Sequence, residues 1–310
     1  MSPVISIIVV TFNRTEDTRR VLLHLKRLTG QPVEVIAVDN ASTDGCADMI
    51  KREFPEVRLL CCTKNRGIAS YNKGFEVARG KFIVTLNNDS YPDKKSIGKI
   101  MEYFKSNKHV GIIQGRIINV TTRRLFYPTT NTFRSLKGIT NFVVTGAAIR
   151  KEVLTGVGNF PESVFLFGAE FDLSLRALSA GFGVEYCDDI LFYHLHRPEY
   201  MPSLFDPFFY HVRSYYWIIW RRYPFAKAID STLWLMLVLL KRAFRERKIG
   251  VLFAATMDTF LKLPSILRER KTVNQDIIRQ VEEQTGRLSI INAIKERSRH
   301  GRLDCRIKEK

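Results

Sequence analysis

The sequence predicts an α/β protein with a mostly parallel central sheet, followed by a region of amphipathic helices. Short apolar runs of strand length alternate with helical patterns through the first 90 residues, which is typical of layered α/β folds. Polar residues follow these runs directly. After about residue 203 the pattern is helical, with aromatic and leucine-rich faces interrupted by Lys and Arg. Intervening helices favour parallel strands, because a parallel neighbour requires a crossover connection.

Each element of the first 90 residues has a local signal. The first strand is a nearly unbroken apolar run, and the helix after it repeats Val21, Leu22 and Leu25 on one face. Thr15 and Thr43 precede helical patterns and are candidate N-caps. The expected order is strand Val4–Val10, a helix from Thr15, strand Val33–Val38, a helix from Thr43 to Phe54, strand Val57–Cys61, helix Ile68–Arg79 and strand Phe82–Leu86.

The second part of the chain has a mixed pattern. Apolar runs predict strands at Val110–Ile118, Phe142–Ile149 and Ile190–Tyr193. A helix is expected from Glu170 to Ala180, and Gly181 ends it. We expect this half to hold the acceptor.

The last third of the chain is strongly basic. The formal net charge is +18 at pH 7, and from residue 201 onward 22 Lys and Arg face 11 Asp and Glu. A solvated helical face, an anionic membrane or nucleic acid would each fit, and charge alone does not decide among them. We expect a solvated or membrane-facing surface and no nucleic-acid partner. No apolar run in this region reaches the ~20 residues that cross a bilayer, so no span is expected.

The beginning of the chain and the cysteines favour the cytoplasm. No basic segment precedes the apolar run at Val4–Val10, which fits a strand better than a signal peptide. The five cysteines show neither a disulfide framework nor metal-binding spacing. We therefore expect a cytoplasmic protein with peripheral contact to the inner face of the cell membrane.

Polar clusters follow all four strands of the first half. Thr11 and Asn13 follow the first strand, Asp39 the second, Arg66 comes shortly after the third, and Asn87–Asp89 follows the fourth. Any one of them alone is typical of an ordinary turn. In a parallel sheet, however, the carboxyl ends of the strands share one edge, and ligands bind in the crevice beyond it. The set therefore predicts a binding crevice at this edge.

Five acidic or imidazole side chains are candidates for chemistry. Asp39 can accept the ring N–H of a nucleoside, and Asp89 can bind a divalent cation next to a diphosphate. Glu170 and Asp172 lie in the first turn of a helix, where favourable interaction with the helix dipole would also explain them. His194 follows a strand and could be a metal ligand, although histidines at strand ends are usually ordinary.

These residues, in this order, resemble the family 2 glycosyltransferases with the GT-A fold, from Val4 to Pro224. The resemblance rests on IVVTFNR at the first strand, VDNASTDG at the second, and Asn65-Arg66-Gly67 followed by Asn72 and Gly74. It implies a fold that binds nucleotide sugars.

The resemblance also implies roles for single residues. Asp39 holds the base of the donor, and Asp89 binds the metal as the last residue of the family's DxD element, whose first acid is Asn in this chain. Glu170 is the general base, one methylene longer than the usual Asp, and His194 joins the metal. The other donor-binding residues are Thr11, Asn13, Arg66, Gly67, Asn87 and Asn88, and Gly146 and Asp172 lie on the acceptor side.

The expected activity is inverting, metal-dependent sugar transfer. The donor would be a dTDP- or UDP-sugar, the metal Mn²⁺ or Mg²⁺, and the acceptor a hydroxyl of a polysaccharide or lipid-linked glycan, as in the rhamnosyltransferases that the chain resembles. Residues 1–202 would form the catalytic domain, with a nucleotide-binding half at 1–90 and an acceptor half at 91–202. Residues 203–310 would form a basic helical region that contacts the membrane.

Two alternatives stay open. A sugar nucleotidyltransferase also needs a nucleotide crevice and a metal, but the usual Gly-rich, basic phosphate loop does not follow Val10. An inactive module that binds nucleotide sugars is the other alternative, because Ala169 and Asn87 depart from the family pattern.

Overall fold

The computed structural model describes residues 4–28, 32–123, 125–127, 141–195 and 206–285. Backbone contacts divide the chain into two compact units. The first consists of Met1–Ser163 and Ala180–His196, and the second of Val164–Ser179 and Arg197–Lys310. The predicted boundary between residues 202 and 203 lies outside the described residues.

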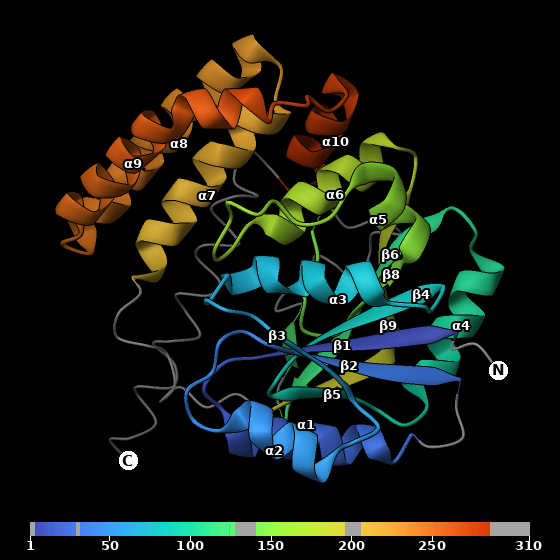
Figure 1. Cartoon of the computed structure of the whole chain (residues 1–310). Helices are drawn as coiled ribbons and strands as arrows, with labels where there is room; N and C mark the ends of the chain where they lie inside the picture. Colours follow the sequence, from blue (N-terminus) through green and yellow to red (C-terminus); the bar gives the residue numbers. More distant parts are fainter. Residues whose placement is uncertain (1–3, 29–31, 124, 128–140, 196–205, 286–310) are drawn as a thin grey trace. The chain divides into compact units, whose positions relative to one another are not determined.

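The first unit is built on one sheet, which has nine strands within the described residues. Its order is β3-β2-β1-β4-β8-β6-β9-β5, and β7 pairs with β6 (Figure 1). The strands are β1 (Ile5–Thr11), β2 (Val33–Asp39), β3 (Arg58–Cys61), β4 (Phe82–Asn87), β5 (Ser90–Pro92), β6 (Val110–Asn119), β7 (Leu125–Tyr127), β8 (Ala147–Arg150) and β9 (Gly183–His194).

The sheet is parallel in its first half and mixed in its second. β1 pairs in parallel with β2 and β4, and β2 with β3. β6 also pairs in parallel with β9, whereas β8, β5 and β7 pair with their neighbours in antiparallel fashion. The predicted sheet is therefore parallel as expected around β1, whereas its second half combines parallel and antiparallel pairs.

Helices cover both faces of this sheet. α1 (Thr15–Lys26) and α2 (Cys46–Glu53) lie on one face, and α3 (Tyr71–Val77) lies on the other (Figure 1). Val21, Leu22 and Leu25 of α1 are buried in the core, as their spacing predicts. The other helices of this unit are the 3₁₀ turn Gly67–Ser70, α4 (Ser96–Ser106) and α5 (Lys151–Val157).

Several local predictions were wrong. Neither threonine caps its helix: the cap positions are Arg14 and Gly45, without a side-chain capping bond from either. The helix expected at Ile68–Arg79 is a 3₁₀ turn followed by a short α-helix. Only the end of Phe142–Ile149 is strand, since Gly146 takes a left-handed φ of +80° just before β8. Sequence reasoning missed the elements β5, β7, α4 and α5.

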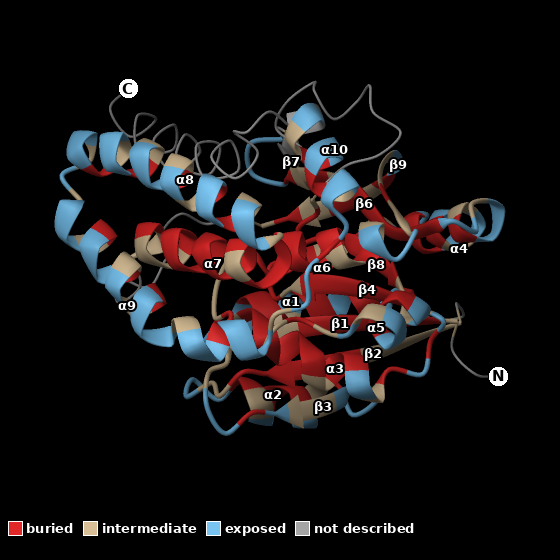
Figure 2. Ribbon diagram, turned by 90° about the horizontal axis from the view of Figure 1, so that it is seen from above, coloured by how far each residue is buried: buried red, intermediate tan, exposed pale blue. Residues whose placement is uncertain are grey.

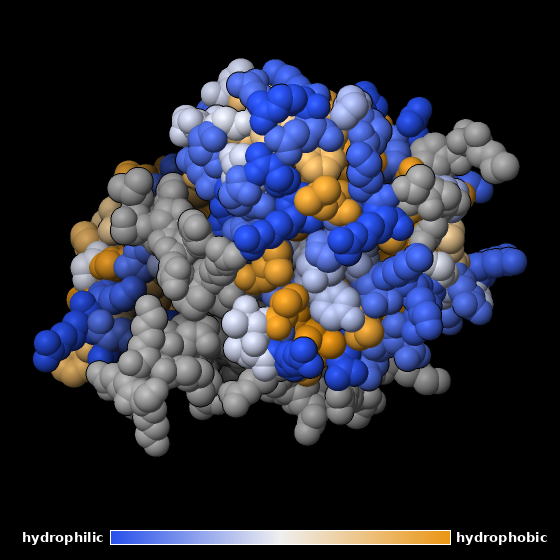
Figure 3. Space-filling view, turned by 90° about the horizontal axis from the view of Figure 1, so that it is seen from below, coloured by the Kyte–Doolittle hydropathy of each residue, from blue (hydrophilic) through white to orange (hydrophobic). Residues whose placement is uncertain are grey.

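The second unit is helical in its described residues. α6 (Ala169–Ser179), α7 (Pro207–Arg222), α8 (Phe225–Arg245), α9 (Ile249–Arg268) and α10 (Gln275–Thr285) make it up. α7 is buried along most of its length, whereas α8 and α9 each present a long exposed side (Figure 2). For comparison, the face seen in Figure 3 is mostly hydrophilic, with hydrophobic side chains in small separate groups.

One described helix, α9, is long and apolar enough to cross a bilayer by length and composition. The expectation of no span considered only unbroken apolar runs, and Thr256 and Asp258 interrupt this one. Leu252, Ala255 and Thr259 of α9 are buried. Since a core helix of a soluble protein passes the same test, this finding alone does not indicate a membrane span.

Candidate active site

The register of the sheet aligns the ends of β1, β2 and β4. Thr11 pairs with Asp39, the neighbouring Val10 pairs with Asn87, and Asp39 also pairs with Cys61 of β3. His194 at the end of β9 pairs with Ser90, directly after Asp89. The structure therefore brings Thr11, Asp39, Asn87–Asp89 and His194 to one edge of the sheet, as the parallel strands require.

Asn13 connects the loops after β1 and β2. It has a left-handed φ of +49°, a conformation that Asn tolerates better than most residues. Its Oδ1 accepts a hydrogen bond from Thr43 N at 2.7 Å, and its own N–H donates to Ser42 Oγ at 3.0 Å. These bonds hold the two loops together, so Asn13 fixes the backbone at this edge of the sheet.

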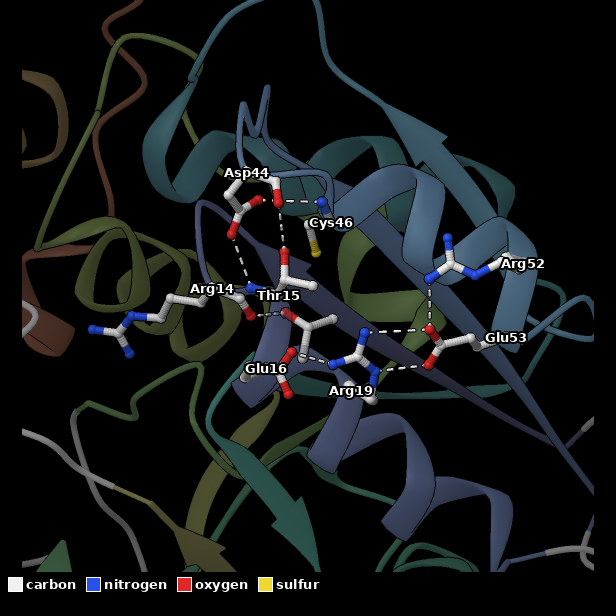
Figure 4. Close-up of polar contacts among 9 residues, drawn as sticks. Arg14, Thr15, Glu16, Arg19, Asp44, Cys46, Arg52 and Glu53 are labelled. Carbon is white, nitrogen blue, oxygen red and sulfur yellow. Dashed lines mark hydrogen bonds and ion pairs between the residues drawn. The ribbon is translucent and has the colours of Figure 1, made fainter.

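Asp44 satisfies N–H groups at the start of both helices. Its Oδ2 accepts from Thr15 N at 2.9 Å and its Oδ1 from Cys46 N at 3.2 Å (Figure 4). This replaces the predicted threonine caps, because the orphan N–H groups of a helix N-terminus need an acceptor from any source. The Arg14 side chain extends away from this cluster (Figure 4).

Asp39 is the buried acid at the end of β2, with only 3% of its surface exposed. Its Oδ2 accepts from Ser42 N at 3.1 Å. Its Oδ1 is buried and has no hydrogen-bond partner within the described part of the chain. Buried polar atoms are nearly always paired, so this oxygen has the capacity for one more donor.

The Asn65–Gly67 loop is fixed by Asn40. Asn40 Nδ2 donates to Asn65 Oδ1 at 2.8 Å, and Asn40 Oδ1 accepts from Arg66 N at 2.8 Å. The Arg66 guanidinium forms an ion pair with Glu162, which also accepts from Asn72 Nδ2 at 2.7 Å. Arg66 and Gly67 therefore lie on a loop with a defined conformation.

The two asparagines after β4 have different partners. Asn87 Nδ2 donates to Thr145 Oγ1 at 2.6 Å, and its Oδ1 accepts from the Tyr71 hydroxyl at 3.0 Å. Asn88 Nδ2 donates to Thr11 Oγ1 at 3.2 Å. Both side chains thus hold neighbouring segments in place, and a contact of Asn87 with a ribose hydroxyl stays a prediction.

Asp89 lies between two nitrogen-bearing side chains. Its Oδ2 accepts from Arg14 Nη1 at 2.8 Å, and its Oδ1 lies 3.2 Å from His194 Nε2. Burial alone would raise the pKa of this carboxyl, but His194 and Arg14 outweigh it and lower the pKa to about 2. Asp89 is therefore ionised throughout the neutral range.

Gly146 occupies a position where a side chain would not fit. Its φ is +80°, and a Cβ atom built on it would lie 2.7 Å from the ring of Phe192, which is fully buried. Its backbone O accepts from Gly115 N at 3.0 Å, and its N–H donates to Thr85 O at 3.1 Å. Its observed role is close packing between strands, and a role toward the acceptor stays a prediction.

Glu170 lies in the second unit, in the first turn of α6, and is 6% exposed. The residues before it adopt unusual conformations: Phe167 and Gly168 both have left-handed φ, at +61° and +84°. For Phe this is strained, and such strain is frequent at functional sites.

α7 holds this strained loop in place. The Phe167 ring stacks on His211 with centroids 3.7 Å apart. The Ser214 hydroxyl donates to Leu166 O at 2.9 Å, and Phe165 contacts Tyr210 with centroids 5.4 Å apart. Three side chains of α7 thus fix the loop that leads into α6, where Glu170 lies in the first turn.

Residues 6–158 match the family model described as glycosyl transferase family 2. Over this segment the chain belongs to the family 2 glycosyltransferases. A solved structure of the mannosyltransferase PcManGT from Pyrobaculum calidifontis, in complex with GDP-Man and Mn²⁺, has a TM-score of 0.57 at 17% identity. It covers 96% of this chain and 87% of that chain, and this likeness confirms the predicted GT-A fold.

Two sequence relatives match over shorter segments of this family 2 glycosyltransferase. The uncharacterized glycosyltransferase YibD of Escherichia coli (strain K12) is 30% identical over 93 residues, which cover 28% of this chain and 27% of that protein. The N-acetylglucosaminyl-diphospho-decaprenol L-rhamnosyltransferase of Mycobacterium tuberculosis (strain CDC 1551) is 36% identical over 67 residues, or 22% of each. Both matches span less than two thirds of the relative's length.

Asp172 of this glycosyltransferase is an anchor inside the second unit. It is fully buried, and its carboxylate accepts from Arg222 Nε at 2.5 Å and from Arg176 Nε at 2.8 Å. Burial would raise its pKa, but Arg176 and Arg222 outweigh this and hold the pKa below its ordinary value. These contacts join α6 to α7, and a role of Asp172 toward the acceptor stays a prediction.

Sequence reasoning missed three side chains that shape the glycosyltransferase site. Arg14 pairs with Asp89 across 75 positions, Glu162 with Arg66 across 96, and Asn40 with Asn65 across 25. Asn40 stood within the VDNASTDG segment, so its place directly after the buried strand was the signal that could have found it. No local pattern indicates the partners of Arg14 and Glu162.

Asp89 and His194 are the side chains of this glycosyltransferase that suit a divalent cation. A buried carboxylate oxygen and an imidazole nitrogen lie side by side, which is a donor set that Mn²⁺ accepts. The Asp89 Oδ1 atom is buried and faces His194 Nε2 at a distance of 3.2 Å. Within the described residues no three His, Cys, Asp or Glu form a metal-binding group. The residues thus fit a cation that takes its further ligands from a diphosphate and water.

Proposed function

We propose that this family 2 glycosyltransferase transfers a sugar from a dTDP- or UDP-sugar to a hydroxyl of a polysaccharide or lipid-linked glycan, with inversion and with a divalent cation. The observation that carries the proposal is the sheet edge, where buried Asp39 and the Asp89–His194 pair follow the ends of strands β2, β4 and β9 of one sheet. In α/β sheets ligands bind beyond the carboxyl ends of the strands, where both kinds of group lie here.

We assign Asp39 to the binding of the donor's nucleobase. Uracil and thymine each present one ring N–H, and the Asp39 Oδ1 atom is a buried acceptor with no partner in the described chain. A hydrogen bond to a charged group contributes about 1.5–3 kcal/mol, more than a neutral one. This oxygen therefore suits a base that presents a ring N–H, as both pyrimidines of the proposed donors do.

The diphosphate of the donor is assigned to the region of Asp89, Arg14 and His194. When bound there, a divalent cation would neutralise the charge that develops on the departing diphosphate. Arg14 is fixed beside Asp89 at 2.8 Å, and its guanidinium can bind a phosphate oxygen as well as a carboxylate. The chain's own basic group would therefore stabilise the leaving group.

Glu170 is assigned as the general base. Its carboxylate would take the proton of the acceptor hydroxyl as the oxygen attacks the anomeric carbon, while the bond from that carbon to the diphosphate oxygen breaks. Attack from the side opposite the leaving group inverts the anomeric configuration. The strained loop before α6, which packs against α7, supports this role. It holds Glu170 in one position before the acceptor arrives.

The proposed class of acceptor is inferred from the name of a sequence relative. The Mycobacterium tuberculosis protein is named for transfer of L-rhamnose to N-acetylglucosaminyl-diphospho-decaprenol, and it matches this chain at 36% identity over 67 residues. We extend its acceptor chemistry, a sugar on a lipid diphosphate, to this chain. Rhamnose from its dTDP donor is the corresponding sugar.

Donor binding and turnover test the proposal separately. A thermal-shift panel of UDP-, dTDP- and GDP-sugars with Mn²⁺ or Mg²⁺ needs no acceptor, because any ligand of the folded state raises its melting temperature. We expect a dTDP- or UDP-sugar to stabilise most. Release of free nucleoside diphosphate in the presence of a lipid-linked saccharide then measures transfer.

Each alternative outcome has a distinct meaning. Binding without release in the presence of a range of acceptors would identify an inactive nucleotide-sugar-binding module. Release of pyrophosphate from a nucleoside triphosphate and a sugar phosphate would identify a nucleotidyltransferase. Failure of every nucleotide sugar to stabilise the protein would reject the assignment of Asp39.

A further inference from the structure

Exposed apolar side chains gather on two helices of the second unit. Among the described residues, thirteen of the fifteen exposed large hydrophobic side chains lie between Phe225 and Leu267, on α8 and α9. The most exposed are Phe244 at 79%, Leu261 at 72% and Phe260 at 70%. Single exposed apolar residues are ordinary, but a concentration of this kind marks an interaction surface. We call it the outer face.

The outer face follows helical spacing. Its residues recur every three or four positions from Phe225 to Phe244 in α8 and from Ile249 to Phe260 in α9. This places them on one side of each helix. Other residues, among them Leu235 and Leu252, form a second apolar side that is buried, and both helices contact α7. Each helix therefore has one apolar side packed within the unit and one that faces outward (Figure 2).

Positive charge surrounds the outer face. From Phe225 to Lys271, ten Lys or Arg face four Asp or Glu. Five of the basic residues lie within positions 241–248, where α8 leads into α9, and Lys241, Arg245 and Arg247 among them are exposed. Apolar side chains flanked by Lys and Arg are typical of helices that lie in the headgroup region of a membrane. An anionic bilayer complements this charge, because its negative surface attracts basic residues close to it.

Other occupants fit the outer face less well. A second copy of the chain would bring two positively charged surfaces together, which costs electrostatic energy. A transmembrane position of α9 would place Asp258 and Lys262 within the bilayer, and Asp258 also lies 3.7 Å from Arg213 of α7. A helix that lies in the plane of the membrane keeps these ion pairs out of the hydrocarbon.

We propose that the outer face of α8 and α9 docks on an anionic lipid bilayer, with both helices in the plane of the membrane. The apolar side chains enter the boundary between headgroups and acyl chains, and the basic residues at 241–248 contact lipid phosphates. This surface is independent of the donor and acceptor, so its test does not depend on the proposed transfer activity.

Flotation of the full chain with vesicles tests the proposal. The vesicles contain phosphatidylcholine with or without about one third phosphatidylglycerol, at low and high salt. We expect binding to the anionic vesicles and weaker binding to neutral ones. Replacing three exposed residues, Phe244→Gln with Phe253→Gln and Phe260→Gln, should lower the bound fraction about tenfold or more. Because these side chains are exposed, circular dichroism should show an unchanged fold.

Two further variants separate the contributions. The triple variant Lys241→Gln, Arg245→Gln, Arg247→Gln should lose most of the preference for anionic vesicles. The double variant Leu23→Gln, Val120→Gln replaces exposed apolar residues of the other unit, at 48% and 37%, and should bind as the unaltered protein does.

Four outcomes would overturn the proposal. One is failure of the chain to float with anionic vesicles at low salt. Another is flotation of the phenylalanine variant to the same extent as the unaltered chain. Resistance to extraction by alkaline carbonate would indicate a spanning helix instead. A dimer that the phenylalanine variant abolishes, without vesicle binding, would identify the outer face as a contact between copies.

Discussion

Replacing Asp172 by Asn removes the one negative charge between two buried guanidinium groups. Asp172 Oδ1 accepts from Arg222 Nε at 2.5 Å, and Oδ2 accepts from Arg222 Nη2 at 3.2 Å and from Arg176 Nε at 2.8 Å. The two arginine side chains are only 8% and 10% exposed. Asn keeps the shape of the side chain but removes the carboxylate charge that both buried guanidinium groups contact.

The expected loss of stability is large. Breaking a buried ion pair costs about 3–5 kcal/mol, and Asn keeps one acceptor oxygen, so we expect about 3 kcal/mol. For a domain of ~150–250 residues this corresponds to a melting temperature lower by about 6–12 °C. The measurement is chemical denaturation followed by circular dichroism, which reports the helical unit.

The same experiment has a matched control and a pH dependence. Asp188→Asn removes a carboxylate whose partner Arg116 is 3.5 Å away, with both side chains well exposed, and should change stability by less than about 0.5 kcal/mol. The pKa of Asp172 is depressed in the folded state, so its contribution is complete above the unfolded pKa of ~3.9 and disappears as the pH falls below it. The two proteins should therefore converge in acid. A loss below about 1 kcal/mol at neutral pH would refute the reasoning.

Three further predictions concern the site. Glu170→Gln should lower turnover about 10²- to 10⁴-fold while calorimetry shows unchanged donor binding, and equal loss of both would contradict its role as base. Asp39→Ala should weaken UDP or dTDP binding about tenfold to a hundredfold, again by calorimetry, and a change under about threefold would reject the base contact. Gly146→Ala should destabilise the fold by about 1–3 kcal/mol in a thermal melt, because its Cβ would meet the buried Phe192 ring, whereas Gly250→Ala has open space and should be neutral or slightly stabilising.

The sheet edge could be predicted from the sequence because hydrophobic burial sets it. Unbroken apolar runs such as Ile7–Val9 have to be buried on both faces, and polar residues cluster where such a strand leaves the core. The positions of Thr11, Asp39 and Asn87 follow from that rule. Their chemical roles do not, and they were carried by the resemblance to the family.

The caps and ion pairs could not be predicted because their partners are distant in sequence. Asp44 satisfies Thr15 N, which no threonine-based rule anticipates. The pairing of Arg14 with Asp89 depends on the fold that brings β1 next to β4. Sequence reasoning also did not anticipate that α9 is long and apolar enough to cross a bilayer. It considered only unbroken apolar runs, whereas α9 meets the criterion through its average composition.

The position of helix α7 has a consequence for the acceptor. It supports the Phe165–Gly168 loop through His211 and Ser214, and it also contacts α8 and α9. A helix with its side chains is about 10 Å wide, so α7 would act as a spacer of fixed thickness beneath the base. If the outer face rests on lipid, Glu170 is carried at a set height above the headgroups. Only those hydroxyls that a lipid anchor presents at that height would then reach it, so the length of the anchored saccharide becomes a criterion of selection.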